Sequence, residues 1–164
     1  NARAETLAEK RSFADAYESR RCLVPADGFY EWVEEDGGKQ PYRVALPDDG
    51  LFAMAGLYER WEPPQRQTGL GEFGTTGGTG DKGGQDEVIE TFTIVTTEPN
   101  DTIADLHHRM AVILDADEES QWLTGDRETA AGLLDPYDDA MRTYPVSTAV
   151  NDPSNDSPGI IEKV

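Results

Sequence analysis

The chain has 164 residues, enough for one domain with a hydrophobic core of its own. It carries 33 acidic and 14 basic residues, a net charge of −19, and no apolar run approaches the roughly 18 residues of a membrane-spanning helix. A single cysteine, Cys22, excludes an internal disulfide and a CxxC metal site, and it suggests a reducing compartment.

The first part of the chain is predicted to hold one helix followed by several strands. Residues 5–21 carry a partial apolar stripe from Leu7 to Tyr17, which favours a helix. Pro25 is expected to divide the first two strands, and Asp-Gly turn signals separate the next ones. The predicted strands are 22–24, 28–34, 41–46 and 51–58.

Residues 62–87 interrupt this pattern. They are rich in glycine and poor in apolar side chains, so they are predicted to be a flexible insertion. The elements expected after it are a strand at 90–97, a turn or short helix at 98–106, a strand at 109–114, short helices at 115–123 and 126–134, and a strand at 142–150. Many strands with few helices between them favour an α+β fold with a curled, mostly antiparallel, barrel-like sheet and short flanking helices.

The acidic residues are spread along the chain and do not form a tail. This favours a globally acidic surface, as in proteins from very salty cytoplasm, where the Debye length falls to about 3 Å at 1 M salt. Such a surface argues against nucleic-acid binding unless basic residues cluster. Arginines do gather near the N-terminus, although the last two could instead cap a helix C-terminus. These arginines are Arg3, Arg11, Arg20 and Arg21.

One carboxylate, Glu31, lies inside the aromatic run Phe29 to Trp32. Strand alternation puts Glu31 on the same face as Phe29 and Val33. If that face points inward, burial raises the pKa of Glu31 and suits it to proton transfer near neutral pH. If it is the solvent face of an edge strand, Glu31 is simply hydrated. The pattern alone leaves both possibilities open.

Two further stretches contain candidate site residues. His107 and His108 precede the predicted strand at 109–114, and imidazole titrates in the physiological range. Adjacent strand residues point to opposite faces and no third ligand has a suitable spacing, so we expect neither a metal nor a cofactor. At the N-terminus, Asn1 could orient a reacting group and Arg3 could hold a phosphate, unless the segment is a frayed end before a helix.

Six segments, in order along nearly the whole chain apart from 62–87, resemble the SOS response-associated peptidase (SRAP) family. The segments are NARAET, RRCLVPADGFYEW, FAMAGLYERW, TFTIVTTEPN, LHHRMAVIL and VSTAVNDPSNDSP. The resemblance implies a single SRAP domain over 1–164. It also implies a protein of the DNA damage response that shields abasic sites in single-stranded DNA. In that family an N-terminal cysteine forms a thiazolidine crosslink with the ring-opened sugar, and autoproteolytic or peptidase-like activity is associated with it.

The resemblance implies roles for three residues that face the reacting sugar. Asn1 would position the crosslink. Glu31 would handle protons during Schiff-base formation and during removal of the initiator Met. His107 would assist the opening of the sugar ring and could help to reverse the crosslink.

It also implies residues that contact DNA. Arg3 and Arg11 match arginines that bind phosphate, and Arg109, which follows His107, is expected to add to this positive surface. Trp32 is expected to pack beside the site, with stacking on bases as the alternative.

The sequence departs from the family pattern in two respects. It begins with Asn1, whereas the family's crosslinking cysteine lies upstream of this motif. We therefore expect the chain to be a fragment that cannot crosslink by itself. In addition, Ala111 stands where the family usually has Pro and His108 where Asp is common; His107 is retained, but its pKa can differ.

Three functions stay open at this stage: an abasic-site crosslinker, a thiol hydrolase using Cys22 with His107 and Glu31, and a non-covalent binder of modified single-stranded DNA. The first is favoured, because Cys22 begins a short apolar strand, where a free cysteine is usually a small buried hydrophobe. We expect a cytoplasmic, nucleoid-associated monomer that does not bind membranes.

Overall fold

The computed structural model describes residues 1–62 and 88–164. The insertion predicted at 62–87 therefore lies, apart from its first residue, outside the described residues.

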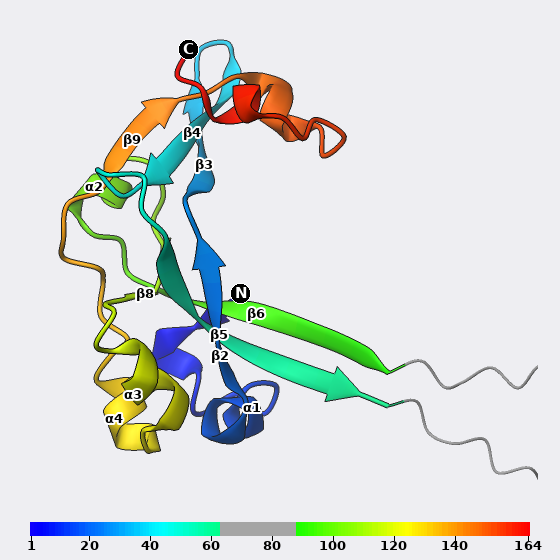
Figure 1. Cartoon of the computed structure of the whole chain (residues 1–164), viewed down its shortest axis with the longest axis vertical. Helices are drawn as coiled ribbons and strands as arrows, with labels where there is room; N and C mark the ends of the chain where they lie inside the picture. The colour runs from blue at the N-terminus through cyan, green and yellow to red at the C-terminus, as the bar shows by residue number, and fades with distance from the viewer. Residues whose placement is uncertain (63–87) are drawn as a thin grey trace, which may run out of the picture.

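The strands form two sheets (Figure 1). The larger sheet has the order β1-β6-β5-β2, with β7 added to β6 and β8 added to β5. Its strands are β1 (Ala2–Arg3), β2 (Arg21–Ala26), β5 (Phe52–Trp61), β6 (Ile89–Thr97), β7 (Met110–Ala111) and β8 (Ile113–Leu114). The smaller sheet consists of β3 (Phe29–Glu35), β4 (Gly38–Ala45) and β9 (Arg142–Pro145). Among the described strands, every pairing except that of β1 with β6 is antiparallel.

The helices are short. They are α1 (Ala14–Ser19), α2 (Asp101–Ala104), α3 (Glu119–Thr124) and α4 (Arg127–Ala131), with 3₁₀ turns η1 (Ala4–Thr6), η2 (Thr148–Asn151) and η3 (Pro158–Ile161). The side chains of Asn100 and Asp126 accept backbone N–H bonds at the starts of α2 and α4, as good N-caps do. None of the described helices has the length and apolar character needed to cross a membrane.

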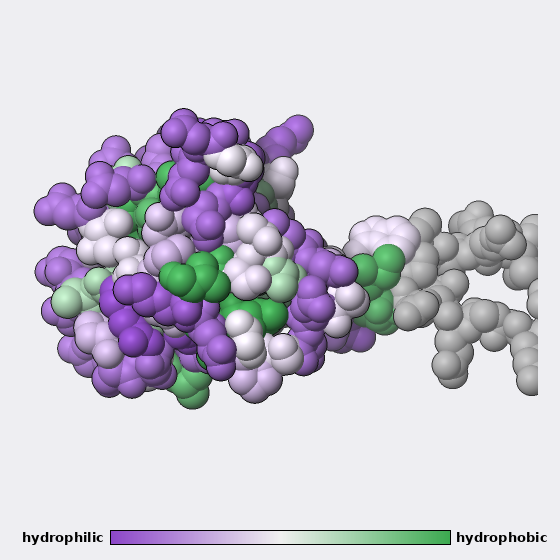
Figure 2. Space-filling model, turned by 90° about the horizontal axis from the view of Figure 1, so that it is seen from above, coloured by the Kyte–Doolittle hydropathy of each residue, from purple (hydrophilic) through white to green (hydrophobic). Residues whose placement is uncertain are grey.

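Two hydrophobic clusters support the sheets. One joins α1, α3 and α4 to the larger sheet, and Tyr17 and Trp122 are its largest buried side chains. The other fills the space around β5, β7 and β4, where Met54, Met110 and Val44 are buried. The surface outside these clusters is mostly hydrophilic on the face that Figure 2 shows. The predicted α+β class, with a curled, mostly antiparallel sheet and short helices, is confirmed.

The predicted helix at 5–21 is wrong over much of its length. Only Ala14–Ser19 is α-helical, and the chain is already in β2 at Arg21, which pairs with Leu57 of β5. Residues between η1 and α1 form turns with local backbone bonds, and from Arg21 onward pairing with β5 satisfies the backbone groups instead. The final strand is also shorter than predicted, since β9 ends at Pro145 and η2 follows.

The predicted strand at 109–114 is split in two. Between β7 and β8, Val112 donates its N–H to the carbonyl oxygen of Val95 and accepts from the N–H of Ala55, each at 2.9 Å. One residue thus bonds to β6 on one side and β5 on the other, so the segment crosses between them and adds to the curl of the sheet.

The break between the first two strands lies at Asp27-Gly28 and not at Pro25. β2 continues through Pro25, which is tolerated because β2 is the edge strand of its sheet. A Cβ at Gly28 would lie 2.8 Å from the carbonyl oxygen of Val44, so glycine allows the chain to pass close to β4 before it enters β3.

Candidate active site

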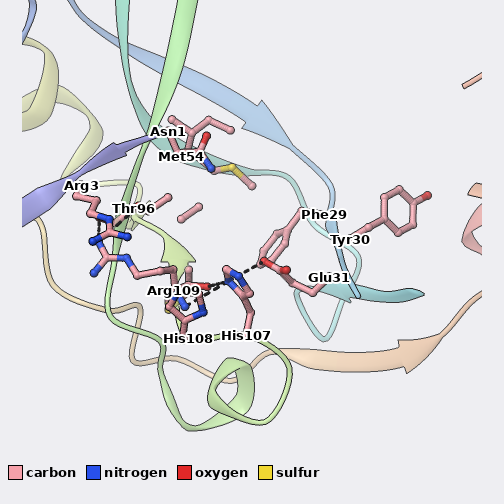
Figure 3. A pocket seen from close by; sticks show the side chains of 13 residues that line it. Asn1, Arg3, Phe29, Tyr30, Glu31, Met54, Thr96, His107, His108 and Arg109 are labelled. Carbon is pink, nitrogen blue, oxygen red and sulfur yellow. Dashed lines mark hydrogen bonds and ion pairs between the residues drawn. The ribbon is translucent and has the colours of Figure 1, made fainter. Parts of the chain in front are cut away.

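A cleft of about 490 Å³ brings together residues from the N-terminus, β3, β6 and the segment before β7 (Figure 3). Five of the seven predicted site residues line it, namely Asn1, Arg3, Glu31, His107 and Arg109. The other lining residues are Phe29, Tyr30, Met54, Ile94, Thr96, His108, Met110 and Ala111.

Asn1 and Arg3 reach the cleft because β1 pairs in parallel with β6. Ala2 faces Val95 and Arg3 faces Thr96 in this register, and Ala2 is fully buried. Alternation along the strand therefore turns Asn1 and Arg3 to the opposite side, toward the cleft. The guanidinium of Arg3 forms no hydrogen bond or ion pair with any residue that the structure describes, which leaves it able to hold an anion.

Glu31 points inward from β3. Phe29 and Val33 on its face are half-buried, whereas on the other face Trp32 and Glu34 are exposed and only Tyr30 is half-buried. The Glu31 side chain keeps only 21% of its exposure. Burial raises the pKa of Glu31, and the neighbouring His107 partly opposes this. Of the two possibilities that the sequence left open, the structure therefore supports the one in which Glu31 faces inward.

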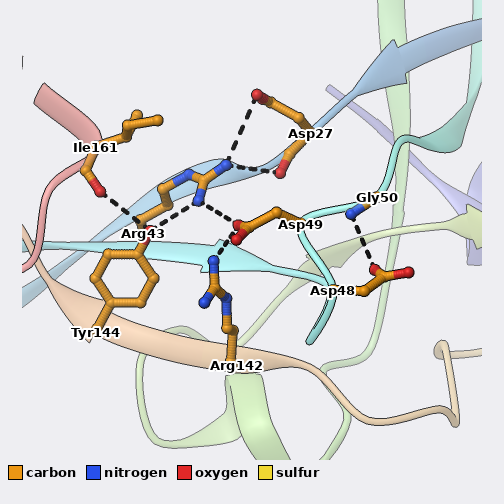
Figure 4. Close-up of polar contacts among 8 residues, drawn as sticks. All are labelled: Asp27, Arg43, Asp48, Asp49, Gly50, Arg142, Tyr144 and Ile161. Carbon is orange, nitrogen blue, oxygen red and sulfur yellow. Dashed lines mark hydrogen bonds and ion pairs between the residues drawn. The ribbon is translucent and has the colours of Figure 1, made fainter. Parts of the chain in front are cut away.

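A buried arginine anchors the strand that carries Glu31 (Figure 4). Arg43 of β4 faces Tyr30 across the ladder and donates to the Tyr144 hydroxyl at 2.7 Å and to Asp49 Oδ1 at 3.0 Å. It also donates to the carbonyl oxygen of Asp27 at 2.9 Å. These bonds fix the turn that precedes β3 to both other strands of the smaller sheet.

His107 lies opposite Glu31 across the cleft. Its backbone N–H donates to Ile103 at the end of α2, and its Nδ1 lies 3.8 Å from Glu31 Oε1. The carbonyl oxygen of Arg109 is 2.9 Å from Nδ1, closer than the Arg109 nitrogen at 3.3 Å. The shorter contact, to the carbonyl oxygen, favours a proton on Nδ1, whereas the N–H contact would need an unprotonated Nδ1. In the tautomer with the proton on Nδ1, Nε2 is the nitrogen that can accept a proton from a substrate.

Arg109 is held inside the protein more firmly than expected for a DNA-binding arginine. Its guanidinium forms a two-pronged ion pair with Glu5 and donates to the carbonyl oxygen of Thr96 at 2.6 Å. Only 15% of its side chain is exposed.

The remaining predicted DNA-contacting residues lie outside the cleft lining. Arg11 is exposed in the turn before α1. Trp32 is exposed on the other face of β3, where its indole N–H donates to Asn151 at 2.8 Å. Arg21 donates to carbonyl oxygens near the ends of α1 and α3, as the capping alternative predicted. Arg20 instead pairs with Glu59, so the alternative fails for this residue.

Cys22 does not line the cleft with His107 and Glu31. It lies in β2 against Gly56, and burial raises the pKa of its thiol. This geometry removes the support for a Cys22, His107 and Glu31 hydrolase. Within the described ranges no group of three His, Cys, Asp or Glu side chains could hold a metal ion.

Sequence reasoning missed Thr96 and Glu5 as contributors to the site. Thr96 is one of several threonines in β6, and nothing in the pattern distinguishes it. Glu5 belongs to the NARAET segment, but its partner Arg109 is remote in sequence. His108, whose ring centroid is 4.4 Å from that of His107, was considered as a metal ligand and as a departure from the family pattern, but no role in the cleft was predicted for it.

Fold and cleft together define an α+β protein with a paired carboxylate and imidazole beside a free arginine. The family model described as "SOS response associated peptidase (SRAP)" matches residues 1–153, and the chain belongs to this family.

Curated relatives and solved structures agree with this assignment. The chain is 43% identical over 167 residues to the abasic site processing protein YoqW of Bacillus subtilis (strain 168), covering 99% of this chain and 66% of that protein. It is 35% identical over 182 residues to the abasic site processing protein HMCES of Gallus gallus, covering 96% and 48%. The chain thus spans two thirds or less of the length of these relatives.

Among solved structures, a protein from Bacteroides thetaiotaomicron superposes with a TM-score of 0.80 at 34% identity, covering 100% of this chain and 65% of that one. A protein from Bordetella bronchiseptica gives a TM-score of 0.70 at 26% identity, covering 90% and 64%.

Proposed function

We propose that the protein containing this domain recognises abasic sites in single-stranded DNA and processes them in the cleft. The observation that carries the proposal is the approach of the Glu31 carboxylate to the His107 imidazole, 3.8 Å apart, in a cleft that Asn1 and Arg3 also line. The names of the similar proteins point to the same substrate.

The Glu31 carboxyl group and the His107 imidazole suit the chemistry of an abasic sugar. The closed sugar is a hemiacetal, and opening it moves a proton from the C1′ hydroxyl to the ring oxygen, which exposes an aldehyde. An amine that attacks this aldehyde gives a carbinolamine, whose hydroxyl must gain a proton to leave as water. A carboxyl group with a raised pKa can donate that proton near neutral pH, and an imidazole Nε2 can accept the hydroxyl proton.

The free arginine accounts for binding of the DNA backbone. Arg3 has no partner among the described residues, and a guanidinium binds phosphate through two parallel N–H bonds. Arg11 continues the positive charge outside the cleft. Asn1 follows the same β1 register as Arg3, so we assign it to orienting the sugar beside the Glu31 and His107 pair.

The covalent part of the proposal rests on the family resemblance. It places the crosslinking cysteine before Asn1, in residues that this sequence does not include. The amine and the thiol of that cysteine would both bond to C1′ and release one water, which gives the thiazolidine. The peptidase activity in the family name would use the same carboxyl group when the residue before the cysteine is removed.

The test uses the complete protein and two single strands of DNA that are identical except for one abasic site. We expect a complex that survives denaturation only with the abasic strand. Because general acid or base catalysis contributes about 100-fold or more, Glu31→Gln and His107→Gln are each expected to slow its formation by roughly that factor. Glu34→Gln, a matched change on the exposed face of β3, is expected to keep the wild-type rate.

Two results would contradict the proposal. A complex that forms equally with the intact strand would exclude recognition of the abasic site. A complex that dissociates in denaturant and weakens with salt would identify a non-covalent binder of single-stranded DNA.

A further inference from the structure

The side chain of one residue, Arg109, contacts the N-terminal segment and β6, two of the parts of the chain that line the cleft. Its guanidinium binds both carboxylate oxygens of Glu5, in η1 directly after β1. Its Nη2 also donates to the carbonyl oxygen of Thr96 at 2.6 Å, and Thr96 is the residue that faces Arg3 across the β1–β6 ladder. The side chain of Arg109 thus binds to the segment that carries Asn1 and Arg3.

The backbone of the same residue holds the imidazole. The Arg109 carbonyl oxygen lies 2.9 Å from His107 Nδ1. Any movement of the Arg109 backbone therefore moves the carbonyl oxygen that favours a proton on His107 Nδ1. The guanidinium and this carbonyl group belong to one residue, which directly precedes β7, a strand of only two residues.

We propose that Glu5 is a positioning residue for His107, which acts by clamping the Arg109 guanidinium so that the Arg109 carbonyl oxygen holds the imidazole in the orientation and tautomer that the cleft requires. The effect on the imidazole is independent of any substrate. Its consequence for the reaction rests on the proposed function.

The charges around the clamp support a permanent contact. Hydrogen bonding to Arg109 lowers the pKa of Glu5, so the carboxylate stays ionised at neutral pH. The Glu5 side chain is 47% exposed and that of Arg109 only 15%, and the two-pronged geometry fixes the direction of the guanidinium. A single-pronged surface pair would leave the guanidinium able to rotate.

The direct test observes the imidazole nitrogens by nitrogen-15 NMR. The chain has only two histidines, so a His108→Gln variant assigns the His107 signals. In the wild-type protein we expect the neutral His107 ring to carry its proton on Nδ1. In Glu5→Gln we expect the ratio of the two tautomers to move toward the Nε2 proton by about threefold or more, because the tautomer follows the hydrogen bond made by the other nitrogen.

A matched control separates this effect from the loss of any ion pair. Glu59→Gln removes an ion pair between Glu59 and Arg20 that lies outside the cleft. The Glu59 side chain is 52% exposed, which is similar to that of Glu5. We expect the His107 signals of this variant to equal those of the wild type. Arg109→Lys keeps the charge but loses the two-pronged contact, so its His107 tautomer ratio is expected to resemble that of Glu5→Gln. Glu5→Asp is expected to restore part of the wild-type tautomer ratio.

A folded Glu5→Gln protein with the wild-type tautomer ratio would overturn the proposal. If Glu5→Gln does not fold, the same ratio measured in Arg109→Lys and Glu5→Asp decides in its place. These spectra need no DNA, so they stand whether or not the proposed function is correct.

With the complete protein and an abasic strand, a second measurement tests the consequence for the reaction. Glu5→Gln is expected to lower the rate of complex formation roughly ten- to hundredfold, the cost of a small misplacement at a reacting centre. The affinity for a strand with a non-reactive abasic analogue is expected to stay within about twofold, since a positioning residue does not contact DNA. An equal loss of affinity would assign Glu5 to binding and overturn the positioning role.

Discussion

Glu31 shows how a single residue acquires its chemistry from its neighbours. It occupies a strand position between Phe29 and Val33, on the side of β3 that packs inward. The cost of burying its charge raises its pKa, and the nearby His107 limits that rise. A carboxyl group in this setting keeps its proton to a higher pH than an exposed one does.

The raised pKa makes stability depend on pH. The folded chain binds the Glu31 proton more tightly than the unfolded chain, so this group favours folding at low pH and opposes it as pH rises through the two pKa values. Glu31→Gln removes this destabilisation by the ionised carboxylate. We therefore expect the free energy of unfolding of this variant to exceed that of the wild type at pH 7, with the gain vanishing below a pH of about 4, near the ordinary pKa of a glutamate.

Urea unfolding of both proteins between pH 3.5 and 8 measures this gain. Glu34→Gln, from the exposed face of the same strand, serves as the control and is expected to show no such trend. A Glu31→Gln protein that is less stable than the wild type at pH 7 would mean that the ionised carboxylate stabilises the fold.

Strand alternation could predict that Glu31 faces inward only once its neighbours were known to be buried. The approach of His107 to it depends on α2 and the segment that follows, which no periodicity reveals. Trp32 and Arg109 illustrate a further limit. The family motif marks both as important, but their partners Asn151 and Glu5 are remote in sequence and become visible only in three dimensions.

At the scale of an element, β3 depends on the turn that leads into it. Gly28 passes so close to β4 that an added Cβ would lie 2.8 Å from the Val44 carbonyl oxygen and 3.0 Å from Arg43 Nε. The Val44 carbonyl oxygen belongs to the backbone of β4 and cannot shift without disturbing the strand. Arg43 is itself held by hydrogen bonds to three other groups. The position of Glu31 in the cleft therefore rests on a glycine three residues earlier.

Gly28→Ala is expected to destabilise the protein by roughly 1–3 kcal/mol, the usual cost of forcing a methyl group into a filled space. Gly37→Ala is the matched control, because a Cβ there meets nothing within 4 Å and its cost should stay within about 0.5 kcal/mol. Chemical denaturation of the two variants compares them. Equal stabilities would show that the turn can relax and does not fix β3.

The strands β5 and β6 could be predicted because turn residues and β-branched or aromatic residues mark them locally. The elements that were missed take their form from distant partners. Val112 splits a predicted strand because Val95 and Ala55 both bond to it, and Arg21 starts a strand because Leu57 lies beside it. A local pattern does not contain these long-range pairings.

At the scale of the whole molecule, the charge of −19 sets the conditions under which the fold and the cleft work. The acidic residues repel one another at low ionic strength, since the Debye length is about 10 Å at 0.1 M salt and about 3 Å at 1 M. Arg3 of the cleft, which has no ion-pair partner in residues 1–62 and 88–164, lies within this acidic surface.

Salt is therefore expected to stabilise the protein. Between 0.1 M and 2 M KCl the free energy of unfolding should rise by at least about 1 kcal/mol, a sizeable part of a typical total stability. Urea is the denaturant for this measurement because guanidinium is itself a salt. A stability that stays constant or falls over this range would mean that the acidic surface does not oppose folding.

The central claim is that Glu31 and His107 act as one unit on one substrate. A double-mutant cycle on the rate of complex formation with an abasic strand tests it most directly, using Glu31→Gln, His107→Gln and the double variant of the complete protein. Because groups that act as a unit are not additive, we predict that the double variant is no slower than the slower single variant, within about threefold. Two losses that multiply in the double variant would show that the groups act independently and would contradict the account.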